Sequence, residues 1–305
     1  MVPDVRRLRL LREVARCGTI AGAAAALHLS APAVSQQLAI LEREVGARLF
    51  ERQARAIRLT SSAWSLVARA ETILAELEAA MADLDQAEGH FGGELRCGAF
   101  PTAMPTLLGP VLASLQRLHP AIVISAEELE PDQALSELST GRLDLAIAHE
   151  YDRVPRRNPT TLHRRDLLTE PMYVVLPLDH WQARQPGAVD LAVLSEEWWI
   201  APPDGLTCFE ELRRTCAAAG FEPRVRCRSY TYETMYALVA AGLGVALVPG
   251  LARRPRDAGT RARLVREPSA KRSVFVAVRS GAEQRPSVAA ALDELAHAAR
   301  SLQSG

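Results

Sequence analysis

The chain has 305 residues and carries 36 basic and 36 acidic side chains, so its formal net charge is zero. This length exceeds one typical domain and predicts two or three, and 48% apolar residues are enough to form real cores. No uncharged run of 18 apolar residues is present, and charges interrupt the N-terminal MVPDVRRLRL, so we expect neither a membrane span nor a signal peptide.

The cysteines are scattered along the chain and form neither a CxxC nor a Cys/His metal pattern; they are Cys17, Cys97, Cys208, Cys216 and Cys227. Scattered single cysteines are typical of a reducing compartment. We therefore predict free thiols, a cytoplasmic location and no metal site.

The zero net charge conceals an uneven distribution along the chain. Residues 1–60 hold ten arginines and five acids, whereas residues 61–89 hold one arginine and six acids. A basic head followed by an acidic segment predicts that the head alone meets a polyanion.

Three short helices are expected in the basic head. Val5 to Arg16 ends at Gly18, and Ile20 to Leu27 follows a capping Thr19 and leads through His28-Leu29 to the next helix. The third helix starts after Ser30, a good N-cap, and ends before Gly46.

The third helix has one apolar face and one unusual polar face. Val34, Leu38, Leu41 and Val45 recur at steps of four and three, which predicts burial of that side. The opposite side carries small residues and amides, which allow close approach to another molecule and pairing with base edges. A helix, a short turn and a projecting second helix predict a helix-turn-helix.

Two short strands, Leu49-Phe50 and Ile57 to Thr60, are expected around a basic turn, Arg52 to Arg55. A basic hairpin beside a recognition helix is a wing, whose arginines can reach a phosphate or the minor groove.

The sequence GTIAGAAAALHLSAPAVSQQLAILEREVGARLFERQARAIRLT resembles the winged helix-turn-helix of the LysR-type transcriptional regulators. The resemblance covers residues 4–60 and departs from the family after LT, where Ser61-Ser62-Ala63-Trp64 replaces a small residue followed by Gly. It implies binding to double-stranded DNA. The residues we expect at the DNA are Ala31, Pro32, Ala33, Ser35, Gln36, Gln37, Arg43, Arg52 and Arg55.

Residues 61–89 are expected to form a long linker helix, because residues 62–88 contain neither Gly nor Pro. A heptad seam runs through Leu66, Ala70, Ile73, Leu77, Ala80, Leu84 and Ala87. The seam predicts a coiled-coil dimerisation rod, while packing on the chain's own domain is the alternative. It resembles the family's linker helix, which pairs two subunits; a tetramer is an expectation from the family alone.

After a linker at residues 89–93, strands and helices alternate to the end of the chain. Expected strands are 95–99, 121–126, 143–148, 172–176, 198–201, 225–229, 245–248 and 274–278, with helices at 105–118, 131–139, 191–194, 207–219, 232–241 and 287–302. This alternation predicts a mostly parallel sheet with helices on both faces. We expect an α/β domain over residues 90–305, with lobe I at 94–166 plus about 270–305 and lobe II at 167–269.

The segments GRLDLAIAHE (141–150) and AGLGVALVPG (241–250) resemble signature strands of the LysR-type effector domain. That domain is similar to periplasmic solute-binding proteins, which implies a small-molecule effector in a cleft between the lobes. Ligands in open α/β sheets lie beyond the carboxyl ends of the strands. The residues we expect there are Phe100, Pro101, Thr102, Glu128, His149, Pro203, Asp204, Tyr232 and Pro249.

Several of these residues have simpler interpretations. Thr102, which matches a family position that often holds an effector carboxylate, can equally cap a helix, and His149 can lie on the surface. Tyr230, Tyr232 and Tyr236 are more typical of a core than of an aromatic pocket, and Glu127, Glu128 and Glu130 of a solvated loop.

The sequence thus predicts a DNA-binding regulator controlled by a small molecule. It contains no G-x-S-x-G, no P-loop, no GxGxxG after a strand and no H-E-x-x-H, so we expect neither an enzyme nor a cofactor. Two alternatives stay open. One is a thiol redox sensor that uses Cys208 and Cys216, and the other is a small-molecule binding protein without a DNA function.

Overall fold

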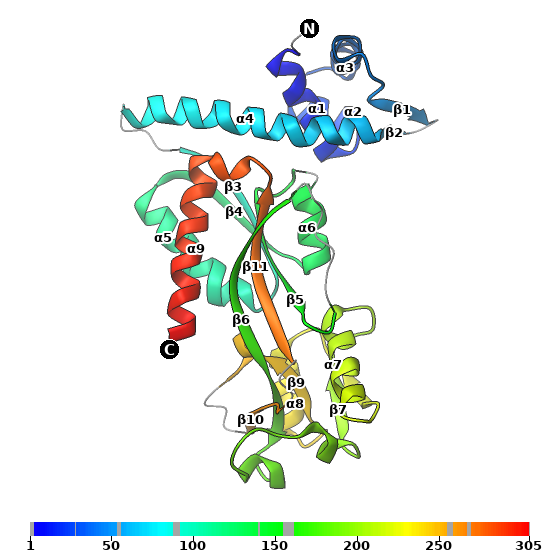
Figure 1. The fold of residues 1–305 in the computed structure, drawn as a ribbon, viewed down its shortest axis with the longest axis vertical. Coiled ribbons are helices and arrows are strands. Elements are labelled where there is room, and N and C mark those ends of the chain that lie inside the picture. The colour runs from blue at the N-terminus through cyan, green and yellow to red at the C-terminus, as the bar shows by residue number, and fades with distance from the viewer. Residues whose placement is uncertain are drawn as a thin grey trace.

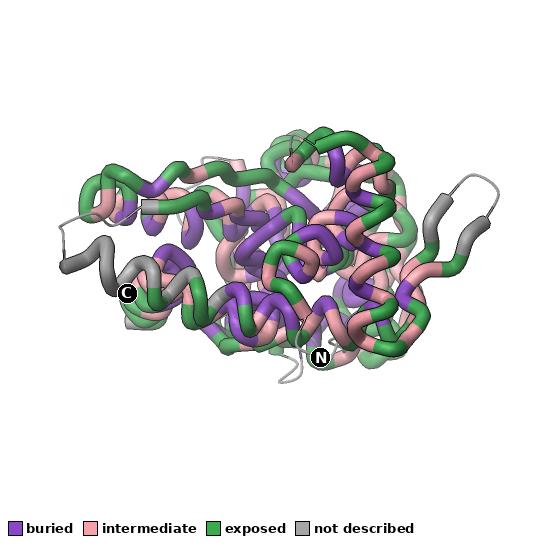
Figure 2. Tube along the Cα trace, turned by 90° about the horizontal axis from the view of Figure 1, so that it is seen from above, coloured by how far each residue is buried: buried purple, intermediate pink, exposed green. Residues whose placement is uncertain are grey.

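The protein is described by a computed structural model that covers residues 3–27, 29–53, 56–87, 92–139, 141–154, 162–254, 259–266 and 270–304. Figure 1 shows an N-terminal group of helices and a long helix, α4, lying across one end of an elongated C-terminal part. Buried residues gather in the interior of the molecule, and exposed residues follow the outer faces of its helices (Figure 2).

The three expected N-terminal helices are confirmed as α1 (Val5–Cys17), α2 (Ile20–Ala26) and α3 (Ala31–Val45). The residue before each helix caps it: Asp4, Thr19 and Ser30 accept hydrogen bonds from backbone N–H groups in the first turns. Gly18 and Gly46 end α1 and α3 in the left-handed conformation, with φ of 67° and 65°. His28 lies outside the described residues.

The expected hairpin is confirmed, with its strands displaced from the predicted positions. β1 (Phe50–Gln53) pairs antiparallel with β2 (Ala56–Leu59), so that Phe50 lies opposite Leu59. The first strand begins one residue later than expected because Leu49 is 1% exposed and belongs to the core of the helices.

Helix α4 (Ser61–Ala87) begins directly after Thr60, whose hydroxyl accepts the N–H of Ala63. The departure from the family pattern at residues 61–64 therefore does not delay the helix. Its first half packs against the N-terminal helices through Ala63, Val67 and Ala70, all buried.

The predicted seam is therefore divided between two environments. Ala70 is buried inside this chain, whereas Ile73 and Leu77 are 47% and 38% exposed. The side chains of Leu84 and Ala87 lie outside the described residues. The alternative interpretation, packing on the chain's own domain, holds for the N-terminal half of the helix.

The C-terminal part is built on a seven-stranded sheet in the order β10-β6-β11-β5-β3-β4, with β9 also paired to β6. These strands are β3 (Gly92–Ala99), β4 (Ala121–Glu128), β5 (Leu145–Tyr151), β6 (Leu162–Pro177), β9 (Ala246–Pro249), β10 (Thr260–Leu264) and β11 (Lys271–Arg279).

The prediction of a mostly parallel sheet is wrong. β3 runs parallel to β4 and β5, but β11 is antiparallel to β5 and β6, and β6 is antiparallel to β9 and β10. The reason is that two long strands, β6 and β11, carry the chain between the lobes in opposite directions (Figure 1). We call the part with β3, β4 and β5 lobe I and the part with β9 and β10 lobe II.

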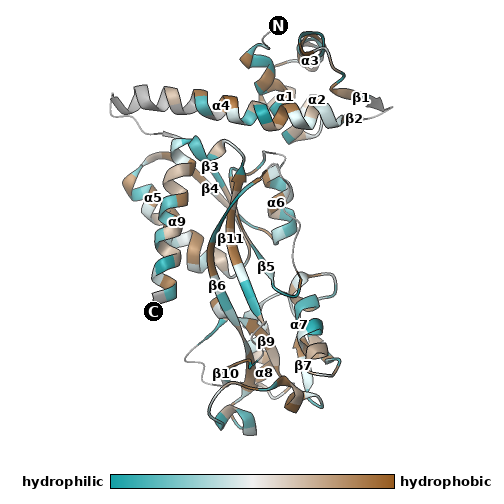
Figure 3. Ribbon diagram, viewed as in Figure 1, coloured by the Kyte–Doolittle hydropathy of each residue, from teal (hydrophilic) through white to brown (hydrophobic). Residues whose placement is uncertain are grey.

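Lobe I is buried on both faces of its sheet, as alternate residues of one strand show. On β11, Val274 and Val276 join a core under α5 (Gly109–Leu118) and α9 (Pro286–Ser304), while Phe275 faces α6 (Pro131–Ser139). Figure 3 shows the β11 ribbon changing from hydrophilic at its Lys271 end to hydrophobic in its middle. A short π-helical turn, Met104–Leu108, leads into α5.

Lobe II adds a small parallel pair, β7 (Trp198–Ala201) and β8 (Arg224–Arg228), with α7 (Thr207–Ala218) and α8 (Tyr232–Ala240). The adjacent tryptophans face opposite sides of β7, since Trp199 is fully buried and Trp198 is 49% exposed. The short 3-10 helices are Trp181–Arg184, Leu191–Leu194, Gly250–Ala252 and Ala282–Gln284.

Candidate functional site: a recognition helix and an interlobe cavity

The exposed face of α3 is the first candidate site. Pro32, Ser35 and Gln36 are exposed, as are Ala39 and Arg43, while Ala31 and Ala33 are half-buried. The opposite face is held in the core by Val34, Leu38 and Leu41, each at most 3% exposed. The helical spacing thus makes small residues and the Gln36 amide project away from the molecule.

Gln37 differs from its neighbour Gln36, because the structure ties it to α1. Arg7 Nε donates to Gln37 Oε1 at 2.9 Å, and the same guanidinium pairs with Glu44. Arg7 therefore fixes the angle between α1 and α3 through two residues of α3.

The wing is anchored to α3 by a carboxylate. Glu42 Oε1 accepts the backbone N–H groups of Leu49, at 2.7 Å, and Phe50, at 3.2 Å. The hairpin consequently starts at a fixed place beside the recognition helix. Arg55 and the side chain of Arg52, both expected at DNA, lie outside the described residues.

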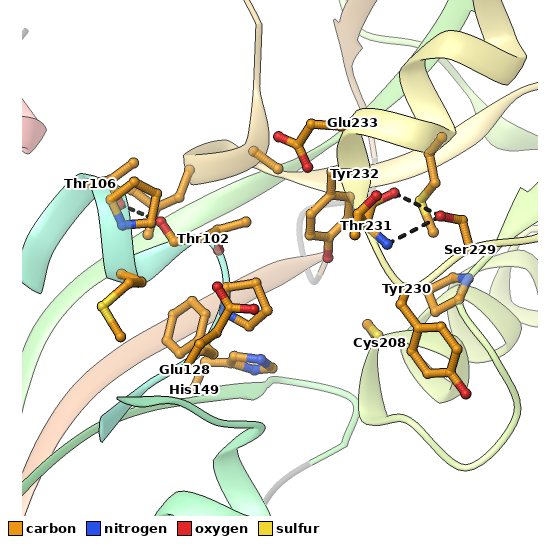
Figure 4. A pocket seen from close by; sticks show the side chains of 18 of the residues that line it. Thr102, Thr106, Glu128, His149, Cys208, Ser229, Tyr230, Thr231, Tyr232 and Glu233 are labelled. Carbon is orange, nitrogen blue, oxygen red and sulfur yellow. Dashed lines mark hydrogen bonds between the residues drawn. The ribbon is translucent and has the colours of Figure 1, made fainter. Parts of the chain in front are cut away.

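The second candidate site is a cavity of about 680 Å³ between the two lobes. Figure 4 shows Thr102, Glu128 and His149 on one side, facing Cys208, Tyr230 and Tyr232 on the other. A volume of this size is typical of small-molecule sites.

Arg272, at the start of β11, forms the charged floor of this cavity. It is 1% exposed, donates from Nε to Glu170 Oε1 at 2.6 Å and from Nη2 to Thr102 Oγ1 at 2.9 Å, and stacks over the Phe100 ring. Burial alone would lower the pKa of Arg272, but the charge of Glu170, its hydrogen bond with Arg272 and the nearby Tyr151 and Tyr232 together outweigh burial and raise the pKa. The floor therefore holds a buried Arg272–Glu170 ion pair.

Glu170 joins both lobes at this point. Its second oxygen accepts the backbone N–H of Leu251 in lobe II, while its first holds Arg272. Gly250 permits this contact, since a Cβ there would lie 2.8 Å from the Glu170 carboxylate. The crossing strand β6 thus carries the residue that ties the floor of the cavity to lobe II.

His149 lines the cavity as a neutral ring. It is 4% exposed and packs edge-on against Phe100 and Tyr151, with ring centroids 4.6 Å and 5.1 Å away. Burial, and then the charge of Arg272, lower the pKa of His149 well below its usual value. The imidazole therefore adds hydrogen-bonding capacity and no positive charge near neutral pH.

Six of the nine residues expected at the effector line the cavity: Phe100, Pro101, Thr102, Glu128, His149 and Tyr232. Pro203, Asp204 and Pro249 do not. Asp204 pairs with Arg228 at 3.0 Å on the exposed side of its loop, and Pro249 is buried in β9 opposite Met172. The chain enters the cavity one or two residues away from these positions, at Pro202 and at Leu251.

The sequence interpretation missed Arg272, although a signal was present. An arginine at the head of the apolar strand KRSVFVAVR is costly to bury and needs a partner. It also missed Tyr230, which is 78% exposed and lines the cavity. The other lining residues not expected are Met104, Pro105, Thr106, Glu130, Pro202, Leu206, Cys208, Ser229, Thr231, Glu233, Met235, Leu251, Ala252, Arg253 and Arg254.

A buried charge network lies at the opposite end of β11, against α4. Asp144, fully buried, pairs with Arg96 at 2.9 Å, Arg285 at 2.7 Å and Arg279 at 3.3 Å. Burial would raise the pKa of Asp144, but hydrogen bonding to Arg96 and the three positive charges lower it well below its usual value. The carboxylate therefore stays ionised and holds β3, β5 and β11 together.

This network reaches the linker helix through Glu71. Arg279 Nε lies 3.2 Å from Glu71 Oε1, a charge–charge contact that is not aligned for a hydrogen bond. Next to it, Thr72 donates its hydroxyl to the Ser280 carbonyl, and Gly281 leaves room for Thr72, which a Cβ would approach within 2.5 Å. One strand thus connects the cavity, at Arg272, with α4, at Arg279.

The comparisons with known proteins cover both ends of the chain. The family model described as the bacterial regulatory helix-turn-helix protein of the lysR family matches residues 5–63, and the LysR substrate binding domain matches residues 88–300. The chain is a LysR-type transcriptional regulator. The α3 face therefore belongs to a DNA-binding domain, and the cavity to a substrate-binding domain.

Relatives of this LysR-type regulator align along nearly its full length. The hydrogen peroxide-inducible genes activator of Dickeya chrysanthemi is 30% identical over 92% of this chain and 91% of its own. The DNA-binding transcriptional dual regulator OxyR of Escherichia coli is 29% identical over 99% and 96%. A full-length OxyR variant from Pseudomonas aeruginosa has 26% identity and a TM-score of 0.72, covering 98% and 95%.

Within the described residues, no helix of this regulator is long and apolar enough to cross a membrane. Cys208 and Cys216, the pair named in the redox alternative, are poorly suited to forming a disulfide in this conformation. Burial raises the pKa of both Cys208 and Cys216 to about 12, so neither is a thiolate near neutral pH. Eight residues apart on α7, they are also roughly 12 Å apart along the helix, whereas a disulfide needs Cα atoms within about 7 Å.

Proposed function

We propose that this regulator controls transcription by changing its binding to promoter DNA when a small molecule occupies the interlobe cavity. One observation carries the proposal: β11 has Arg272 in the floor of the cavity and Arg279 against the linker helix. A ligand that favours one arrangement of the lobes would shift the position of β11, and a shift of β11 would move α4.

On the DNA side, we propose that α3 enters the major groove with Pro32, Ser35 and Gln36 leading. Gln36 pairs with an adenine edge, and Pro32 and Ala33 lie beside thymine methyl groups. Arg43 and the wing arginines, Arg52 and Arg55, bind phosphates and set the register. Gln37 supports this contact by holding α3 against Arg7 of α1.

We propose further that two copies pair through the exposed part of α4, where Ile73 and Leu77 project. A two-fold dimer would present two recognition helices to a palindromic site, with half-sites about one helical turn or a multiple of it apart. The division of the chain into residues 4–60, 61–89 and 90–305 follows from these three roles. A tetramer is expected from the family resemblance alone.

The test joins ligand binding to DNA binding in the full chain. A thermal-shift screen of carboxylates, aromatic acids and amino acids identifies stabilising compounds, and a footprint on the DNA upstream of the gene and its neighbours is then repeated with each. We expect a stabilising compound to lengthen, shorten or bend the protected region. The matched control is Thr102→Val, which removes the hydroxyl to which Arg272 donates and keeps the shape of the side chain. Compounds that stabilise the protein and leave every footprint unchanged would contradict the proposal.

A second candidate function is thiol-based sensing, which the peroxide-inducible relatives favour. The raised pKa values of Cys208 and Cys216 oppose it. Thiol counting after peroxide treatment separates the two functions: five free thiols and an unchanged footprint support the small-molecule regulator. Loss of two thiols together with a changed footprint, abolished by Cys216→Ser, would support the redox sensor.

A further inference from the structure

The charges around the interlobe cavity are divided between its two walls. Lobe I contributes the carboxylates of Glu128, the last residue of β4, and Glu130, which follows the strand, and both residues line the cavity. Lobe II contributes Arg253 and Arg254 together with Glu233. The lobe I wall is thus acidic, whereas the lobe II wall carries charges of both signs with an excess of one positive charge.

Glu128 is the acidic residue of this wall that is available to a ligand. It is exposed, points into the cavity beside His149 in Figure 4, and forms no ion pair with any residue in the described part of the chain. His149 and Arg272 line the same cavity but do not neutralise Glu128. His149 is neutral near pH 7 because burial lowers its pKa, and Arg272 is held by Glu170.

Arg253 plays the corresponding part in lobe II. Its guanidinium lies over the Tyr173 ring, 5.0 Å from the centroid, and no acidic partner accompanies it among the described residues. Arg254, by contrast, is paired with Glu233 at 2.8 Å. Helix α8 also starts at this wall with Tyr232, so that the positive end of its dipole adds to the charge of Arg253.

The space between these walls is lined mainly by apolar and aromatic groups. Met104 lies on the lobe I side, and Leu206, Tyr230, Tyr232 and Met235 lie on the lobe II side. Tyr230 is 78% exposed and therefore offers a free ring face to a ligand.

We propose that the effector is a zwitterion, an α-amino acid with an apolar or aromatic side chain. Its ammonium group binds the Glu128 carboxylate of lobe I, its carboxylate faces Arg253 of lobe II, and its side chain lies among Tyr230, Tyr232 and Met104. A molecule with one charge for each wall binds both lobes best when they close, which gives it the differential affinity that a conformational change requires. The inference rests on the proposed function and names its effector class.

Calorimetric titration of the full chain with three matched compounds tests this inference. L-Phenylalanine carries both charges, 3-phenylpropanoate lacks the amine, and 2-phenylethylamine lacks the carboxylate; L-leucine and L-methionine extend the set to other side chains. We expect at least one of the three amino acids to bind, and its counterpart without the amine and its counterpart without the carboxylate each to bind at least tenfold more weakly.

Two variants assign the charge to its residue. Glu128→Gln is expected to weaken the amino acid at least tenfold and to leave the deaminated acid unchanged or tighter. Glu127→Gln is the matched control, because Glu127 is the adjacent exposed acid and does not line the cavity. It is expected to bind the amino acid as the wild type does.

Three results would overturn the inference: no binding of any of the three amino acids, equal binding of an amino acid and its deaminated acid, or an amino acid affinity that Glu128→Gln leaves unchanged. The proposed function survives each of them if another compound class still alters the footprint. It fails separately if no cavity ligand of any class alters DNA binding.

Discussion

Replacing Glu71 by Gln removes the charge through which the linker helix contacts β11. Glu71 and Arg279 are 3% and 5% exposed and lie 3.2 Å apart. Removing one partner of a buried ion pair costs about 3–5 kcal/mol. Asp144 remains 3.3 Å from Arg279 and offsets part of that cost, so we expect a loss of about 2–3 kcal/mol.

Hydrogen exchange measures this loss at the place where it arises. A loss of that size corresponds to roughly 30- to 150-fold faster exchange for amides that open with the contact, here those of residues 61–75 and 272–282. Glu76→Gln is the control, since Glu76 is an exposed acid on the same helix. Exchange in these segments that changes by less than threefold, or that changes equally in both variants, would show that Glu71 does not hold α4 to the effector domain.

Three further outcomes follow from the same structure. Burial raises the pKa of Glu211 to about 7, so the folded protein keeps a proton that the unfolded chain releases; this contribution to stability is complete below about pH 4.5 and is lost as the pH rises through 7. Glu211→Gln should therefore stabilise the protein at pH 8 by roughly 2–3 kcal/mol and reduce the change of its melting temperature between pH 5 and 8. Glu210 is a half-exposed neighbour, and Glu210→Gln should have neither effect. Ile73→Glu combined with Leu77→Glu should convert a dimer into a monomer in sedimentation, and Val193→Glu, equally exposed in lobe II, should leave the mass unchanged. In salt titrations of DNA binding, Arg43→Ala should lower affinity for all sequences alike and reduce the salt slope by about 1; a slope equal to that of the wild type would remove Arg43 from the phosphate contacts.

The three N-terminal helices could be predicted to within about one residue at each end. These helices are local structures, with caps at Asp4, Thr19 and Ser30 and a regular apolar face on α3, and local signals of this kind are legible in one sequence. The seam of α4 was harder to interpret, because periodicity shows that a face is apolar and does not show what covers it. Ala70 meets α1 of the same chain, while Ile73 meets solvent.

The sheet could be predicted less well because its pairing is non-local. The start of β6, with His163, Arg164, Arg165 and Asp166, is too charged to resemble a strand, yet residues 162–171 of β6 form nine pairs with β11. β5 begins at Leu145 rather than at 143, since Asp144 turns its carboxylate toward three arginines. No local sequence pattern predicts the pairing of β6 with β11 or of Asp144 with the arginines.

The residues of the cavity could likewise be predicted only in part. Thr102 follows β3, Glu128 ends β4 and His149 lies near the end of β5, so the rule of carboxyl strand ends located all three. Arg272 lies at the other end of a strand that enters lobe I from lobe II, where that rule does not apply. Its partner Glu170 is 102 residues away in the sequence.

The central claim is that the exposed face of α3 reads DNA sequence, and an equilibrium titration of Gln36→Ala tests it most directly. Fluorescence anisotropy compares wild type and variant on the upstream binding site and on a scrambled duplex at one salt concentration. The account predicts a loss of about 1–3 kcal/mol, roughly 5- to 150-fold, on the specific site, and an almost unchanged affinity for the scrambled duplex. An equal loss on both duplexes, or no loss on either, would contradict it.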